Sequence, residues 1–251
     1  MRVRGFTLIE MIVTMLVGSI LVLGIAGFVE LGTKGYAQSV DRQRLQTQAR
    51  FVLEKMTREA SHAVPNVFIE DGGCLSFFPI VDSGFYAVSG ADINFIVGNQ
   101  SAAVSTLNDK QLLINPTQTL SPTDTLAALN NSFDLASVED ISATLSTVGK
   151  TFSIPDVASG LVGGSIVNRH YIAANERKVT YCISGNRITR QVGFTGSPMP
   201  LTDSDEVSVS GSLSYSPATV QHNGVVHIDL SFSQGGESTI FQQDVQVLNV
   251  P

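Results

Sequence analysis

The residues that most often perform chemistry in proteins are scattered through this sequence. The run Gly163-Gly164-Ser165 lacks the second glycine, two residues after the serine, that a nucleophile elbow requires. The histidines show no spacing typical of zinc ligands or of a metalloprotease helix; they are His62, His170, His222 and His227. We expect a solvated His62 on a helix, and polar His222 and His227 flanking a turn. The sequence therefore predicts no enzyme, no catalytic residue and no cofactor.

One acidic cluster offers the hard oxygen ligands that calcium prefers. It is the run Asp203-Ser204-Asp205-Glu206. The glycine and the distal glutamate of an EF-hand loop are missing, so a solvated turn is the favoured interpretation. We predict no metal site.

A carboxylate stands at the edge of a segment that can cross a membrane. Met11 to Val29 is a run of 19 residues without a charge, close to the length that spans the hydrocarbon core. Glu10 precedes it directly, where an ionised group costs about 3 kcal/mol or more without a partner. Arg2 and Arg4 lie before the run and favour a cytoplasmic N-terminus with the rest of the chain outside. The alternative is a secretory signal peptide, but its apolar region is usually shorter and its small cleavage residue follows that region.

The N-terminal residues resemble a known processing motif. Gly5-Phe6-Thr7-Leu8-Ile9-Glu10 followed by an apolar helix is similar to the motif of type IV prepilins and type II secretion pseudopilins. The resemblance implies cleavage after Gly5 by prepilin peptidase and methylation of the new amine of Phe6. It also implies an assembly contact between Glu10 and the terminal ammonium of a neighbouring subunit. The alternative is an ordinary membrane anchor with a coincidental match.

The predicted helix continues beyond the membrane. Residues 1–5 would be a leader and residues 6–31 the transmembrane and assembly helix. In residues 32–64 apolar side chains recur at three- and four-residue steps, which predicts an amphipathic continuation. They are Leu45, Ala49, Val52, Leu53, Met56, Ala60, Ala63 and Val64. Charged residues, including possible Glu54–Arg58 and Lys55–Glu59 pairs, occupy the opposite face. Pro65 marks the expected end, giving a helix roughly 90 Å long.

Five glycines weaken this helix by about 1 kcal/mol each relative to alanine. They are Gly18, Gly24, Gly27, Gly32 and Gly35. Small residues permit close packing between helices in a membrane. The alternative is that the region from Gly24 to Gly35 melts when the subunit enters a filament, although no proline lies there.

Residues 65–251 are expected to form a β-rich head. Short β-branched and aromatic runs predict strands at 74–79, 93–97, 111–115, 167–173, 178–184, 187–193, 207–215, 224–232 and 238–248. Hairpins are predicted at Gly185-Asn186 and Gly235-Gly236. The predicted fold class is α+β and pilin-like, with a long N-terminal helix packed on a mainly antiparallel sheet.

Charge is distributed unevenly along the chain. The formal net charge is −7, made of zero in residues 1–31, +3 in residues 32–64 and −10 in residues 65–251. Without a basic cluster in the head, nucleic acid is excluded as a partner. Residues 80–165 hold two lysines against eight acidic residues and show weak periodicity. They predict an inserted lobe, either a binding region or an elaborated loop set without a partner.

The two cysteines, Cys74 and Cys182, both lie in the head. In an oxidising periplasm an even pair predicts one disulfide, which by loop-closure entropy contributes about 4 to 5 kcal/mol. Two buried free thiols are the alternative.

Further stretches resemble one group of minor pilins. Residues 50–59, 74–79, 179–182 and 246–251 are similar to the MshO minor pilins of mannose-sensitive haemagglutinin pili, with the broader pattern of PilW and GspJ proteins. The resemblance implies a minor pilin that primes pilus assembly and sits at the fibre tip. Its partners would be other minor and major pilins, prepilin peptidase and the inner-membrane assembly platform. The head would be periplasmic before assembly. The alternatives are a GspJ-like pseudopilin and a tip adhesin for a surface glycan.

Overall fold

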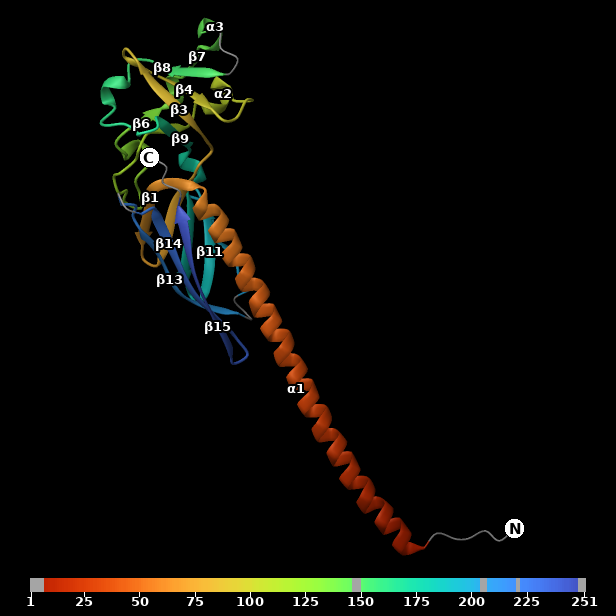
Figure 1. Ribbon diagram of the computed structural model, residues 1–251. Helices are drawn as coiled ribbons and strands as arrows, with labels where there is room; N and C mark the ends of the chain where they lie inside the picture. Colours follow the sequence, from red (N-terminus) through yellow and green to blue (C-terminus); the bar gives the residue numbers. More distant parts are fainter. Residues whose placement is uncertain (1–6, 146–149, 204–206, 220–221, 248–251) are drawn as a thin grey trace.

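A computed structural model describes residues 7–145, 150–203, 207–219 and 222–247. Helix α1 (Leu8–Ser61) has 54 residues and is about 80 Å long at 1.5 Å per residue. It carries a β-rich head at its C-terminal end (Figure 1). All strand pairs among the described residues are antiparallel. The predicted α+β, pilin-like fold is thereby confirmed.

The helix ends earlier than the sequence predicts. It stops at Ser61, and Ala63, Val64 and Pro65 begin strand β1 (Ala63–Asp71). A proline disfavours the helical conformation of the residue before it, and that residue, the β-branched Val64, favours a strand. The apolar stripe is nonetheless buried on both sides of this boundary. Helical periodicity was therefore a correct guide to burial but a wrong guide to the last turn.

Two sheets pack against one face of the C-terminal part of α1. One has the order β1-β2-β10-β11-β12, and the other β13-β14-β15. The remaining strands of these sheets are β2 (Cys74–Pro79), β10 (Val179–Ser184), β11 (Arg187–Val192), β12 (Met199–Pro200), β13 (Ser208–Ser216), β14 (Gly224–Gln234) and β15 (Glu237–Val247). Apolar residues of both sheets and of α1, such as Leu45, Phe77 and Phe232, share one core. The helix is thus part of the hydrophobic core of the head from Leu45 onward.

A third sheet lies at the end of the head farthest from the N-terminus (Figure 1). Its order is β6-β5-β9-β3-β4-β8-β7. The strands are β3 (Asp82–Ser89), β4 (Asp92–Val97), β5 (Gln111–Leu113), β6 (Ser132–Asp134), β7 (Glu139–Asp140), β8 (Thr151–Ile154) and β9 (Arg169–Ala173). Short helices connect them: α2 (Val104–Leu107), α3 (Ser142–Leu145), and four 3-10 turns at Leu126–Ala128, Leu135–Ser137, Ala158–Gly160 and Asn175–Arg177. We call this sheet and its connections the distal lobe. It has its own apolar core, and a second cluster containing Val64, Phe78 and Tyr171 joins it to β1 and β2.

All nine predicted strands are present, within a few residues of their expected bounds. Both hairpins turn where predicted, since Gly185, Asn186, Gly235 and Gly236 all have positive φ. The sequence missed β1, β3, β6, β7, β8 and β12. Most of the missed strands belong to the distal lobe, which the weak periodicity of residues 80–165 had not resolved into a sheet.

His170 lies in the core of the distal lobe. Its side chain is fully buried, its ring meets Phe95 edge-on at 5.2 Å, and neither ring nitrogen has a hydrogen-bond partner. Burial lowers the pKa of His170 from 6.5 to about 3. The ring is therefore neutral at physiological pH. Gly84 is its cross-strand neighbour, and a Cβ there would lie 1.8 Å from the carbonyl oxygen of Ile96.

Candidate functional site

The start of α1 holds the carboxylate that the sequence singles out. Glu10 is exposed, and its Oε2 accepts hydrogen bonds from the Thr7 amide at 3.4 Å and the Thr7 hydroxyl at 3.3 Å. Thr7 is the N-cap, so the acidic side chain closes the first turn of its own helix. These two bonds are long and weak. Glu10 therefore keeps acceptor capacity for a stronger partner, whereas the predicted processing residues Gly5 and Phe6 lie outside the described residues.

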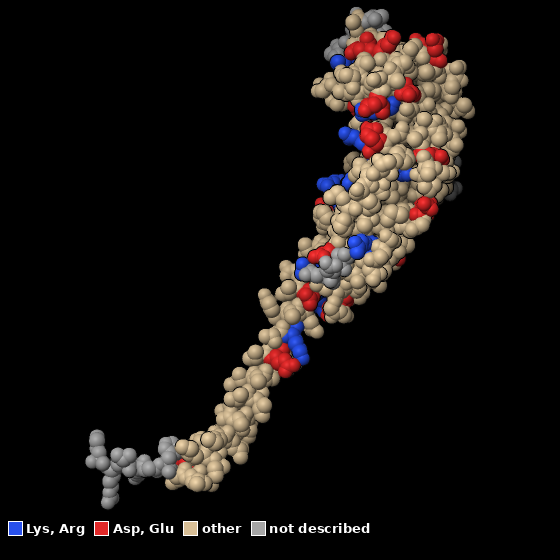
Figure 2. All heavy atoms as spheres, turned by 180° about the vertical axis from the view of Figure 1, so that it is seen from behind, with Lys and Arg blue, Asp and Glu red and all other residues tan. Residues whose placement is uncertain are grey.

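The first half of α1 is an apolar rod with no partner inside the chain. No described residue of α1 before Leu45 is buried, and large side chains such as Leu8 and Phe28 are each 79% exposed. The side of this rod that faces away from the viewer in Figure 1 also has almost no charged atoms, as Figure 2 shows. Within the described residues, α1 is the one helix long and apolar enough to cross a membrane. So large an apolar surface requires lipid or other apolar helices around it.

The glycines of this rod have no role in packing within the chain. A Cβ added at Gly18, Gly24, Gly27, Gly32 or Gly35 would meet nothing within 4 Å. The helix is continuous through all five positions. The small size of these glycines is therefore not explained by contacts within the chain. Close helix packing and local melting both remain explanations that involve a membrane or an assembly.

A polar cluster fastens α1 to the five-stranded sheet. Glu59 Oε2 accepts a hydrogen bond of 2.7 Å from the Tyr181 hydroxyl and one of 2.9 Å from Arg190 Nε. Lys55 Nζ lies 3.4 Å from the other carboxylate oxygen. We call these four residues the Glu59 clamp. It confirms the predicted Lys55–Glu59 pair, but Glu59 is not on a solvated face as expected, since its side chain is only 19% exposed.

The clamp has a clear electrostatic order. Burial on its own would raise the pKa of Glu59, but hydrogen bonds from Arg190 and Tyr181 and the nearby positive charges outweigh it and lower that pKa. Burial and the hydrogen bond to Glu59 raise the pKa of Tyr181 well above its usual value. The cluster thus holds a charged carboxylate with a neutral phenol. The other predicted pair, Glu54 with Arg58, does not form an ion pair in the described structure.

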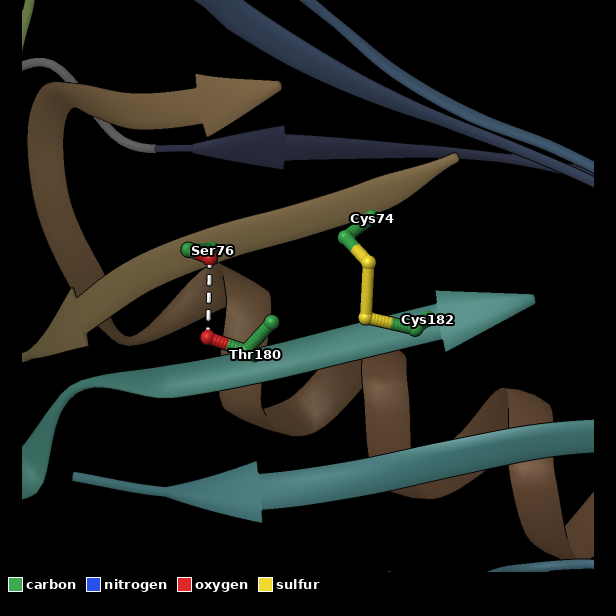
Figure 3. Close-up of a disulfide and its surroundings, with 4 residues drawn as sticks. All are labelled: Cys74, Ser76, Thr180 and Cys182. Carbon is green, nitrogen blue, oxygen red and sulfur yellow. Dashed lines mark hydrogen bonds between the residues drawn. A yellow bond between two sulfur atoms is a disulfide. The ribbon is translucent and has the colours of Figure 1, made fainter. Parts of the chain in front are cut away.

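The two cysteines are bonded to each other. Cys74 and Cys182 are directly opposite on the neighbouring strands β2 and β10, with Cα atoms 4.0 Å apart and a sequence separation of 108. Beside them the hydroxyls of Ser76 and Thr180 are 2.8 Å apart. Figure 3 shows this hydrogen bond next to the disulfide, between the same two strands. The predicted disulfide is confirmed, and the free-thiol alternative is wrong. The whole distal lobe lies within the closed loop.

The other chemical candidates take structural positions. His62 is exposed at the end of α1, with Nδ1 2.9 Å from the carbonyl oxygen of Arg58. His227 does not flank a turn: it lies within β14, where Nδ1 is 2.7 Å from Asp244 Oδ1 and Nε2 is 3.0 Å from Ser216 Oγ. This serine–histidine–aspartate chain lies on the outer sheet face, where the Asp244 side chain is 71% exposed. Because solvent weakens the electrostatic coupling in so exposed a chain, we interpret these three residues as a cross-strand polar pairing and not as a catalytic group.

Metal ligation finds no support in the part of the chain that the structure describes. No group of three or more His, Cys, Asp or Glu side chains is arranged to hold a metal ion there. The acidic cluster at 203–206, weighed above as a calcium site or a solvated turn, lies mostly outside the described residues, which include only Asp203 of the four.

Comparison with known proteins bears on the N-terminus. Residues 1–26 match the prokaryotic N-terminal methylation motif. The match covers 26 of 251 residues and includes Gly5, Phe6, Glu10 and the first turns of α1. It supports a likeness to type IV pilins and pseudopilins at the N-terminus, and the single long apolar helix found among the described residues fits one membrane-spanning segment. No curated protein and no solved structure matches the chain.

Proposed function

We propose that the chain is a minor pilin of a type IV pilus of the mannose-sensitive haemagglutinin type. The observation that carries the proposal is the methylation motif running directly into a helix whose first half is bare and apolar. The resemblance of residues 50–59, 74–79, 179–182 and 246–251 to the MshO minor pilins supports the finer assignment. In this proposal, residues 1–5 are removed, residues 6–31 wait in the inner membrane and the head faces the periplasm. The subunit then primes the fibre and stays at its tip.

Glu10 has a physical role in this proposal. An ionised carboxylate and a free terminal ammonium are each costly in an apolar environment, and pairing them between two subunits removes both costs. The weak bonds from Thr7 to Glu10 in the isolated chain support a carboxylate that can exchange partners. The pair would set the register of each incoming subunit.

A pseudopilin of the GspJ kind is the second candidate, because the methylation motif is common to both kinds of subunit. Deleting the gene and scoring fibre number and exoprotein secretion side by side separates them. Loss of fibres with normal secretion supports the minor pilin, and the reverse result supports the pseudopilin.

Two substitutions test the processing and assembly steps. Gly5→Leu is expected to leave an unprocessed precursor, seen as a larger band on a gel; a mature band of normal size would contradict the proposal. Glu10→Val is expected to insert in the membrane yet enter fibres poorly. Glu30→Gln is the matched control, because Glu30 pairs with Lys34 within α1 at 2.7 Å. Equal incorporation of both variants would remove the role of Glu10.

A further inference from the structure

Strand β15 forms a long and regular open edge. It ends the sheet β13-β14-β15, and β14 is its one strand partner in the described structure. Its pairing runs without a bulge from Gln234↔Glu237 to Gly224↔Val247. Proteins usually protect such edges with proline, lysine or a bulge. The 11 residues of β15 contain no proline and no lysine, and its two charged residues already have partners: Glu237 pairs with Arg42, and Asp244 lies 2.7 Å from His227.

The hairpin geometry shows which backbone groups face outward. Gly235 and Gly236 form a two-residue turn with φ of 58° and 88°, typical of a type I′ turn. In such hairpins the closing pair, here Gln234 and Glu237, exchanges both hydrogen bonds, and every second pair after it does the same. In the pairs that alternate with these, the residues of β15 point their backbone N–H and C=O groups away from β14, toward the open edge. They are Ser238, Ile240, Gln242, Asp244 and Gln246.

A groove of about 470 Å³ lies between this strand and α1. Apolar side chains of Leu53 and Phe241 line it, together with Arg50 and Arg58 and, four residues from each of them on α1, Glu54. Both arginines are exposed, and neither forms an ion pair among the described residues. The Thr57 hydroxyl in the same lining is buried without a hydrogen-bond partner. The groove thus combines an apolar lining, a polar group left unsatisfied and a net positive charge, since two arginines outnumber one glutamate, beside a row of free backbone groups.

We propose that β15 and this groove bind an extended acidic segment of a neighbouring, different pilin-type subunit by strand addition. The free N–H and C=O groups of β15 pair with the incoming backbone, as in other strand-addition complexes. Arg50 and Arg58 select a segment with Asp or Glu, while Leu53 and Phe241 receive an apolar side chain. The proposal rests on the proposed function, which makes α1 before Leu45 the assembly surface and makes other kinds of pilin the neighbours of a subunit at the tip. The groove continues that surface along the same helix.

The test uses the full chain in cells that make the fibre. The photocrosslinker p-benzoylphenylalanine replaces Glu54, which lines the groove. We expect a crosslink to a different chain with an N-terminal methylation motif, mapped by mass spectrometry to an extended acidic segment. Gln242→Pro removes an outward N–H without loss of a backbone hydrogen bond to β14. It should lower the yield about tenfold, as expected for a lost backbone bond and impaired strand fit.

Gln242→Thr is the matched control, since both variants lose the 3.2 Å bond from Gln242 to Asp229 but threonine keeps the N–H. The double change Arg50→Glu and Arg58→Glu should also lower the yield, whereas Arg177→Glu, an exposed cation elsewhere, should not. Equal yields for Gln242→Pro and Gln242→Thr overturn the proposal, and so does a crosslink to a second copy. If fibres form normally but no crosslink is found, the strand-addition proposal is overturned and the proposed function stands. If the chain is neither processed nor assembled, the proposed function is overturned instead.

Discussion

His170 makes the distal lobe sensitive to acid. With its folded pKa at about 3 and its unfolded pKa at 6.5, the unfolded lobe binds a proton that the folded lobe excludes. The neutral ring is fully compatible with folding above pH 6.5, and stability falls as the pH drops from there toward 3. At pH 5 the loss is about 2 kcal/mol, from 1.5 pH units at about 1.36 kcal/mol each.

His170→Leu should abolish this loss. Leucine fills the apolar site without a titratable group, so at pH 7 we expect a change within about 1 kcal/mol of the native protein. At pH 5 the variant should be more stable than the native protein by about 2 kcal/mol. His222→Gln is the matched control, because His222 is exposed and its loss should leave the pH dependence unchanged.

Hydrogen–deuterium exchange of the full chain in detergent micelles measures the effect where it arises. Peptides from β3, β4 and β9 report the opening free energy of the distal lobe, once exchange rates are corrected for their intrinsic pH dependence. Peptides from β14 and β15 serve as an internal reference. If His170→Leu and the native protein lose the same opening free energy between pH 7 and pH 5, the reasoning from burial is refuted.

Other parts of the head give sharp expectations. Tyr181→Phe should cost about 1.5 to 3 kcal/mol in urea unfolding, because it removes a hydrogen bond to the charged Glu59; no measurable change would show that the clamp is not stabilising. Reducing the Cys74–Cys182 bond should lower stability by about 4 to 5 kcal/mol, with an unchanged urea midpoint under reductant as the contrary result. Gly84→Ala should lower the opening free energy of the distal lobe, measured by hydrogen exchange, by at least about 2 kcal/mol, because the added Cβ would overlap the Ile96 carbonyl. Protection equal to that of the native protein would contradict this expectation.

Local patterns in the sequence predicted what local physics decides. The predicted strand at 224–232 is present as β14, where Val225, His227, Asp229 and Ser231 alternate with buried apolar neighbours. The cysteines, each within a strand-like run, predicted their own bond. The helix end was wrong because Pro65 can terminate a helix or stand inside an edge strand, and the apolar stripe continues unchanged through either.

Contacts between distant segments could not be predicted in the same way. Glu59 reads as one more charge on a helix face, and its partners Tyr181 and Arg190 lie 122 and 131 residues away. Strand β8 was missed because Thr151–Ile154 is only four residues long, yet all four are buried in the folded lobe. His170 gave no signal at all, since neither its type nor its spacing distinguishes a core histidine from a solvated one.

The position of the disulfide has a consequence for how this head can vary in evolution. The chain leaves the five-stranded sheet at the end of β2 and returns at β10, and these strands are neighbours bonded at Cys74 and Cys182. In topological terms the distal lobe is one very long hairpin loop, with a base closed by hydrogen bonds and by sulfur. Such a loop can lengthen, shrink or be exchanged for another without a change in strand order beneath it. The base that packs on α1 and the distal lobe can therefore change separately, except at the apolar cluster of Val64, Phe78 and Tyr171 that joins them.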